Sequence, residues 1–322
     1  MKYNFFLWVV LLVFSCNQPE LPVKISRMEQ SLFNLSAGSI ADSISSLELQ
    51  YGKLFDLFCI NIIRIGSPER QGFSDRLAGF ITDPTMYSAY RRVQEVYPDL
   101  KNIESALGKA FFNYQKEFSD MPIPTVYTII SGFNESIITS DTIIAIALDN
   151  YLGRKEEMYF LLETDFYRQR LMDPQYLVPD CMKGWLLTEF PYNDSISNVL
   201  TNVLYEGKIM YALKQLLPHT PDSTLFGYSS EQMRWCQNNN AQMWTFLVDR
   251  KLLFSTDQLV INKLINPAPF CALFTRESPG RAAVWLGYKI VASYMKNTGT
   301  TTKELLLNED YRYILDKARF NP

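Results

Sequence analysis

The apolar residues of this 322-residue chain follow helical spacing along most of its length and change to β-branched runs in one block. Outside residues 125–148 they recur three and four positions apart, which places them on one face of a helix. Within residues 125–148, runs rich in Ile, Val and Thr alternate with turn residues such as Gly132 and Asn134, as in strands. The pattern predicts an α+β fold: one helix-rich body with a small, mostly antiparallel sheet in the middle third.

Several helices can be placed from their apolar faces and their ends. Apolar stripes predict helices over residues 44–65, 98–118 and 196–218, and in the segment after Gly280. Gly66 and Pro68 end the first of them. Capping boxes that begin at Ser229 and Thr301 predict two more helix starts.

The composition suits a globular protein and excludes several kinds of partner. Apolar residues make up 47% of the chain and charged residues 20%, which excludes a disordered protein. Lys and Arg together number 31 against 34 Asp and Glu. Since no basic run accompanies this balance, we expect no nucleic-acid partner.

His219 is the single histidine of the chain. Histidine is the commonest general base and metal ligand near neutral pH, so its scarcity removes much of the enzyme repertoire. His219 lies between Pro218 and Thr220, just after a predicted helix, where we expect a structural or exposed side chain. The sequence also lacks the motifs of serine-elbow hydrolases, dinucleotide-binding proteins, P-loop proteins and aspartic proteases.

The N-terminal residues predict a lipoprotein signal. The apolar run over residues 5–14 is too short to cross a hydrocarbon layer of roughly 30 Å, but it is typical of a secretory signal. Residues 13–16, Val-Phe-Ser-Cys, resemble a bacterial lipobox, in which the cysteine is acylated and becomes the new N-terminus. The sequence therefore predicts three parts: a signal peptide over residues 1–15, a lipidated tether over residues 16–22 and a folded body over residues 23–322.

An acylated Cys16 would attach the protein to a membrane without a spanning helix. No later apolar run in the sequence reaches the roughly 18 residues that a transmembrane helix needs. We expect a lipoprotein of the cell envelope that faces the periplasm. Its expected partners are the membrane and other envelope proteins, and no cofactor is expected.

Four cysteines remain after Cys16, and none of them lies in a C-x-x-C spacing. They are Cys59, Cys181, Cys236 and Cys271. An even number allows disulfide pairing in an exported protein. A chain of this length does not need such cross-links, so we expect four buried free thiols.

Five short phrases occur in a fixed order along the chain. They are the lipobox Cys16; Val126-Tyr127-Thr128 with Ser131-Gly132-Phe133-Asn134; residues 146–153; Tyr205-Glu206-Gly207-Lys208; and residues 277–281 with 285–287. Together they resemble the gliding-motility-associated lipoproteins of the GldB type, which are found in Bacteroidetes. The resemblance implies an envelope lipoprotein that holds protein partners within a gliding apparatus.

That family in turn resembles, more distantly, predicted zinc peptidases of the gluzincin kind, in which a later glutamate completes an H-E-x-x-H site. Glu206 resembles this glutamate, and the segment around Asp180 occupies the expected place of the histidine pair. A zinc site needs three protein ligands, and one histidine cannot supply the pair. The resemblance therefore implies a peptidase-like scaffold without the metal centre. The alternative is a metal site with replacement ligands drawn from Asp180, Cys181, Glu206 and His219.

A vestigial groove or partner site is expected around five residues: Asp180, Glu206, Lys208, Tyr211 and Arg281. On a helical wheel Glu206 lies at the edge of an apolar stripe. A half-buried carboxylate there would pair with Arg281 or Lys208, or bind a ligand. The alternative is a plain structural ion pair or a solvated helix edge.

The main hypothesis is a non-catalytic envelope lipoprotein that acts through protein partners. The competing hypothesis is an envelope hydrolase. Such an enzyme would use a metal with replaced ligands, or a pair of carboxylates acting on a glycan. A carboxylate pair leaves no spacing signal because its members meet only in the fold.

Overall fold

The structure is a computed structural model and describes residues 19–322. The predicted signal peptide and the predicted lipidation site Cys16 lie outside the described residues. Within the described range, no helix combines the length and the apolarity needed to cross a membrane.

The sheet has four strands: β1 (Ile25–Arg27), β2 (Thr125–Ile129), β3 (Ile137–Ser140) and β4 (Ile143–Ala147). Their order across the sheet is β1-β2-β4-β3. The pairs β1–β2 and β2–β4 are parallel, and the pair β3–β4 is antiparallel. The small sheet of the middle third is thus confirmed, but its pairing is mixed rather than mostly antiparallel, and one strand comes from the N-terminal segment.

Burial explains this strand order. All five residues of β4 are buried, as in a central strand that is covered on both faces. All four residues of β3 are half-buried, as suits an edge strand. A turn at Asp141 and Thr142 joins β3 and β4 as a hairpin, and the apolar β4 takes the place beside β2.

Six α-helices lie between β1 and β2: α1 (Met28–Phe33), α2 (Ile40–Tyr51), α3 (Lys53–Leu57), α4 (Phe73–Thr82), α5 (Pro84–Val96) and α6 (Lys101–Glu117). The prediction of one helix over residues 44–65 is wrong in its continuity. Gly52, at φ 48°, separates α2 from α3, and a π-helical turn, Phe58–Ile62, follows. Glycine reaches positive φ at little cost and therefore ends the first helix.

The helices after β4 are α7 (Glu157–Leu161), α8 (Phe166–Gln169), α9 (Pro174–Glu189), α10 (Val199–Leu216), α11 (Asp222–Phe226), α12 (Ser230–Asn238), α13 (Asn240–Asp249), α14 (Gln258–Ile265), α15 (Ala282–Thr298), α16 (Thr302–Leu307) and α17 (Tyr311–Ala318). The predicted capping boxes at Ser229 and Thr301 are present and begin α12 and α16. A further capping box at Asn198 begins α10. The starts at Ser229 and Thr301 were predictable because capping is local, whereas the box at Asn198 was not predicted.

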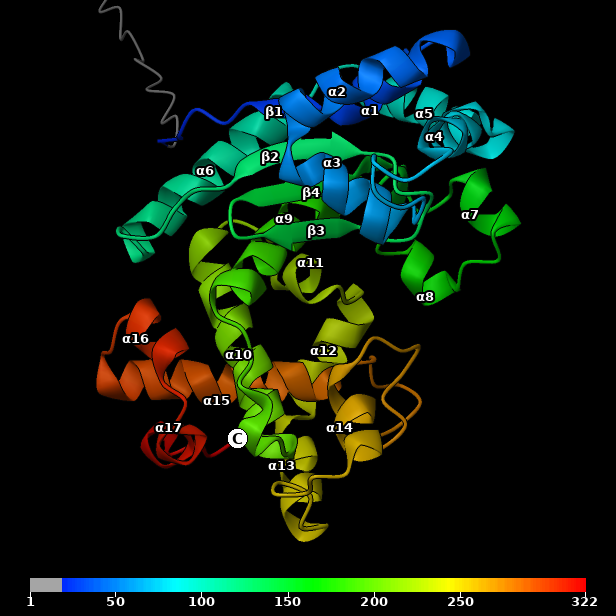
Figure 1. Cartoon of the computed structure of the whole chain (residues 1–322). Helices are drawn as coiled ribbons and strands as arrows, with labels where there is room; N and C mark the ends of the chain where they lie inside the picture. Colours follow the sequence, from blue (N-terminus) through cyan, green and yellow to red (C-terminus); the bar gives the residue numbers. More distant parts are fainter. Residues whose placement is uncertain (1–18) are drawn as a thin grey trace, which may run out of the picture.

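Helix α9 connects the two halves of the molecule. It packs against β3 and β4 on one side and against α6 and α10 on others. In Figure 1 the sheet and α1–α6 form the upper half, and α10 and α12–α17 form the lower half. In the lower half α10 and α15 cross in close contact, with Gly207 and Gly287 at the crossing. Buried apolar side chains from both halves belong to one hydrophobic cluster.

The four cysteines of the described part are free and buried, as expected from the sequence. Burial raises the pKa of Cys59 and of Cys236 to about 12, and it also raises the pKa of Cys181 and of Cys271. Because the thiolate is the reactive form, a chain that starts at Pro19 should resist alkylation by iodoacetamide until it is unfolded. Mass spectrometry of the alkylated protein tests this, and rapid alkylation of the native chain would contradict it.

Candidate functional site

Glu206 lies at the centre of a cluster of charged side chains between α9, α10 and the start of α15. Its carboxylate accepts hydrogen bonds from Arg281 at 2.9 Å and from Lys183 at 3.3 Å. Each of the three side chains is about a fifth exposed. Arg281 precedes α15 at φ 60°, an uncommon backbone conformation for a residue with a side chain.

Asp180 belongs to the same cluster. It lies on α9, one turn before Lys183, and accepts a hydrogen bond of 2.9 Å from the Tyr151 hydroxyl. Burial raises the pKa of Asp180 to about 6, although Tyr151, Lys183 and Arg281 each act in the opposite direction. The cluster thus contains two carboxylates and two cationic side chains.

The charges of the cluster compensate one another. Burial alone would raise the pKa of Glu206, but Lys183 and Arg281 outweigh it, and the pKa of Glu206 is lowered. Burial and the charge of Arg281 lower the pKa of Lys183, and Glu206 opposes that shift. Glu206 therefore stays ionised between two cations, as in a structural ion-pair network.

The structure separates the other two candidate residues from this cluster. Lys208 is buried on another side of α10, where its ammonium donates to the backbone oxygen of Asn308 at 2.8 Å and lies over the ring of Tyr311. Tyr211 lies with its ring near that of Tyr288. The expected pairing of Glu206 with Arg281 is present, whereas Lys208 is not its partner. Lys183 of α9, which was not among the predicted residues, takes that place. No local pattern indicated it, because the pair joins two different helices.

The donor set around Glu206 does not fit a metal ion. Among the described residues, no three His, Cys, Asp or Glu side chains come together in a way that could hold one. Two cationic groups within 3.3 Å of the Glu206 carboxylate would also repel a divalent cation. His219 lies elsewhere, exposed after the end of α10.

A cavity of about 490 Å³ opens beside Asp180, between the loop after β2 and residues 162–172. Buried Asp149 holds that loop, because its carboxylate accepts the backbone N–H groups of Ser131 at 3.0 Å and Phe133 at 2.7 Å. Four parts of the chain that lie far apart in the sequence meet around the cavity and the charged cluster: residues 131–133, residues 149–151, Glu206 and residues 279–281. Four of the five phrases that carry the family resemblance therefore converge in the fold.

The raised pKa of Asp180 predicts a pH effect on stability. Between about pH 4, the usual carboxyl value, and pH 6 the folded state binds more protons than the unfolded state, so stability should fall as the pH rises. For a group shifted by this much, the loss is at most about 3 kcal/mol. In Asp180→Asn this pH-dependent loss of stability should be absent. Burial also raises the pKa of Asp149 to about 6, but Asp149 is present in both proteins, so its effect cancels in the comparison. Urea unfolding of both proteins from pH 4 to pH 7 tests this, and parallel curves would contradict it.

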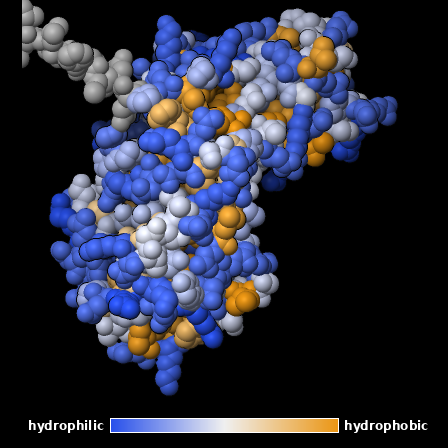
Figure 2. All heavy atoms as spheres, turned by 90° about the vertical axis from the view of Figure 1, so that its left-hand side faces the viewer, coloured by the Kyte–Doolittle hydropathy of each residue, from blue (hydrophilic) through white to orange (hydrophobic). Residues whose placement is uncertain are grey.

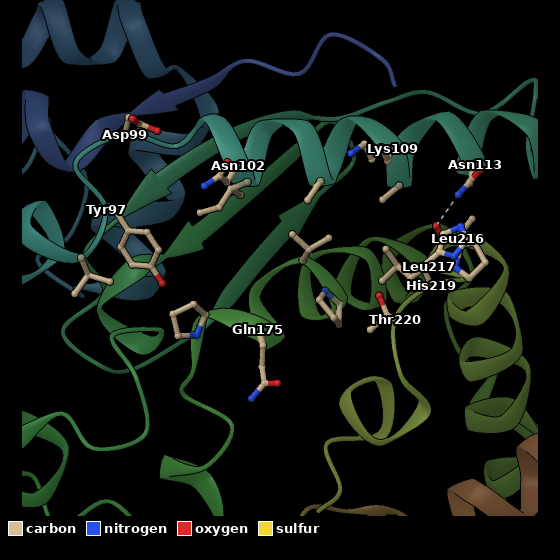
Figure 3. Close-up of a pocket in the computed structure, with 18 of the residues that line it drawn as sticks. Tyr97, Asp99, Asn102, Lys109, Asn113, Gln175, Leu216, Leu217, His219 and Thr220 are labelled. Carbon is tan, nitrogen blue, oxygen red and sulfur yellow. Dashed lines mark hydrogen bonds between the residues drawn. The ribbon is translucent and has the colours of Figure 1, made fainter. Parts of the chain in front are cut away.

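A larger cavity is a groove of about 770 Å³ along α6 (Figure 3). Asn102 and Lys109 of α6 form one wall, Gln175 at the start of α9 lies opposite, and His219 lies at one end. Much of its surface is apolar, from Ile103, Ala110, Val178, Pro179, Leu216 and Leu217. Because its walls come from three distant segments, no motif or periodicity indicated the groove.

The comparisons with known proteins support the resemblance. A family model described as gliding motility protein GldB matches residues 15–322. No curated protein and no solved structure matches the chain, so the likeness to gluzincin peptidases stays a prediction.

The matched range begins directly before Cys16 and includes every described residue. It also contains all five phrases on which the resemblance was based. The chain therefore belongs to the GldB family, a family of gliding-motility-associated lipoproteins of the cell envelope.

Proposed function

We propose that this protein is non-catalytic and works by holding protein partners in a gliding-motility or related machinery of the envelope. In this proposal its lipid anchor is acylated Cys16, its body faces the periplasm, and its fold is a peptidase-like scaffold without the metal centre. The observation that carries the proposal is the charge-compensated state of Glu206, whose carboxylate is already engaged by Lys183 and Arg281.

The groove along α6 is the proposed contact for a partner. Its apolar surface combines with a few hydrogen-bonding side chains, among them Asn102, Gln175 and Thr220. Such a combination is typical of binding sites. Asp99 is the one acidic residue among those that line the groove, so the groove contains no carboxylate pair.

Site-specific photo-crosslinking in intact cells tests the partner hypothesis. A benzophenone amino acid in place of Asn102, on the wall of the groove, should give a discrete crosslinked product that mass spectrometry can identify. The matched control replaces Asn262, an equally polar and exposed residue on α14. Equal products at both positions, or none at Asn102, would contradict the proposed contact.

The lipid anchor is tested separately. Mass spectrometry of the N-terminal peptide from membrane-extracted protein should show a diacylglycerol on Cys16, with further acylation of the new amino terminus. An unmodified N-terminus downstream of Cys16 would contradict the anchor and leave the groove hypothesis standing.

One observation favours a hydrolase as the second candidate. The two carboxylates of the cluster have pKa values shifted in opposite directions, since Asp180 is raised to about 6 and Glu206 is lowered. A split of this kind is typical of an acid–base pair. Release of sugars from envelope glycans by the purified protein, and its loss in Asp180→Asn, would support the enzyme over the partner-binding role.

A further inference from the structure

Residues 19–25 lie along α6 and are held there by specific contacts. The backbone N–H of Leu21 donates to the backbone oxygen of Gly108 at 3.0 Å. The Ser105 hydroxyl donates to the Glu20 carboxylate at 2.6 Å, and the Glu104 carboxylate accepts the N–H of Ile25 at 3.0 Å. We call residues 19–25 the strap, because they bind the N-terminal segment to one helix.

Gly108 allows the strap to lie this close. A Cβ atom at this position would overlap the backbone carbonyl of Leu21. Any other side chain would have to push the strap away from α6. The strap is therefore part of the packed body, although residues 19–22 fall in the tether that was predicted over residues 16–22.

The strap leaves little free chain before the proposed anchor. Cys16 and Pro19 are three residues apart, so their Cα atoms can be at most about 11 Å apart. If Cys16 carries the lipid, as the proposed function requires, the start of the strap stays near the membrane surface. The adjoining part of α6 must then lie near the membrane as well.

The exposed side of α6 beside the strap is basic. Lys101, Ser105, Lys109, Phe112 and Lys116 follow one another at spacings of three and four and so share one face. We call these five residues the ridge. Lys101 and Lys116 are exposed, and the ammonium of Lys116 lies 5.8 Å from the centre of the Phe112 ring. The ridge has three cationic side chains, and the exposed Glu20 carboxylate of the strap lies against Ser105. The remaining excess of positive charge suits the anionic headgroups of a bilayer.

The views agree with this placement. In Figure 1 the N-terminal segment passes beside α6 in the upper half of the molecule. Figure 2 looks at this side, which is mostly hydrophilic with separate hydrophobic patches. This suits a surface that lies on headgroups rather than one inserted in the hydrocarbon.

We propose that the strap fixes the orientation of the protein on its membrane, with the ridge of α6 docked on the lipid headgroups. The groove adjoins the ridge, since Asn102, Lys109 and Asn113 of the same helix line it. A partner in the groove is then held at the bilayer surface, which favours a membrane-proximal segment of that partner.

Fluorescence quenching on vesicles tests this orientation. The mature chain, residues 16–322, is coupled through Cys16 to a maleimide lipid in vesicles of phosphatidylethanolamine and phosphatidylglycerol that contain a headgroup nitroxide lipid. A fluorescent amino acid replaces exposed Gln115 of α6 or, as the control, exposed Val248 of α13 in the lower half. We expect strong quenching at position 115 and weak quenching at position 248.

Two variants should let the protein turn freely on the membrane while Cys16 stays attached to the lipid. A Gly/Ser linker of about ten residues inserted after Gln18 lengthens the reach and leaves every strap contact intact. Gly108→Ala displaces the strap itself. Both should abolish the difference in quenching between the two positions, and vesicles of phosphatidylcholine alone should reduce it.

Equal quenching at both positions in the unaltered chain, or a difference that survives the linker, would overturn the proposal. If position 115 is not quenched on protein-free vesicles and added envelope proteins shield it from solvent, the ridge binds a protein partner instead of the membrane. Because the lipid is attached chemically, the result does not depend on acylation of Cys16 in the cell. A failure of the proposed anchor is therefore distinguishable from a failure of the strap.

Discussion

Gly287→Ala should destabilise the protein by about 3 kcal/mol, because the substituted Cβ would occupy the backbone of a neighbouring helix. At the crossing of α10 and α15, a Cβ on Gly287 would overlap the carbonyl group of Val203. A Cβ on Gly207 would overlap the backbone of Gly287. The two helices would have to move apart and lose packing along their contact. Gly287→Val should be still more damaging and leave little folded protein.

Thermal and urea unfolding measure this loss, with about 2–4 °C of melting temperature expected per kcal/mol in a chain of this size. The matched control is Gly79→Ala, because Gly79 is also helical but has no neighbouring atom near its Cβ position. The control should be neutral or slightly stabilising. A Gly287→Ala protein as stable as the control would show that the crossing adapts to a side chain.

Glu206→Gln should cost about 3 kcal/mol of folding free energy, because it leaves Lys183 and Arg281 without their shared counter-charge. This free-energy cost is at the low end of the range for breaking a buried ion pair, since each of the three side chains is about a fifth exposed. The effect also has a pH signature. The folded pKa of Glu206 is lowered, so the stabilisation is complete above the unfolded value of about 4.3 and disappears as the pH falls through the folded pKa.

Unfolding by urea at pH 7 and at lower pH measures this difference. Glu95→Gln is the control, because Glu95 is exposed and its partner Arg92 keeps Glu156, so the loss of this pair should cost little. A combined Lys183→Met, Glu206→Leu and Arg281→Met protein should recover part of the loss, since apolar groups can replace a buried network. A Glu206→Gln protein with wild-type stability would mean that the two cations find other partners or water.

The same Glu206→Gln protein separates the two functional hypotheses. If the cluster is structural, the photo-crosslink at Asn102 should persist at temperatures where the variant remains folded. If Glu206 acts as one of a carboxylate pair, hydrolysis would be lost even where stability is retained. The readouts are independent because the groove and the cluster use different residues.

Local features of the fold were predictable from the sequence. The stripe over residues 98–118 gave α6, the stripe over residues 196–218 gave α10, and the boxes at Ser229 and Thr301 gave two helix starts. Periodicity and capping depend on residues within one or two turns, so no tertiary information is needed. The break at Gly52 was missed because a glycine inside an apolar stripe is also compatible with a continuous helix.

By itself, the sequence determined the helix-rich class, the apolar faces of the main helices, the place of three of the four strands and the family, since these depend on local patterns and on phrases in a fixed order. Tertiary structure alone decided that β4 lies between β2 and β3, because strand order depends on which strand can be covered on both faces. It also decided that Lys183 rather than Lys208 pairs with Glu206. Residues 206 and 208 are two positions apart on α10, so their side chains differ by roughly 200° in direction. Lys208 therefore faces α16 and α17. Lys183 reaches Glu206 from α9 instead. The groove and the strap likewise join segments distant in sequence, and only packing brings them together.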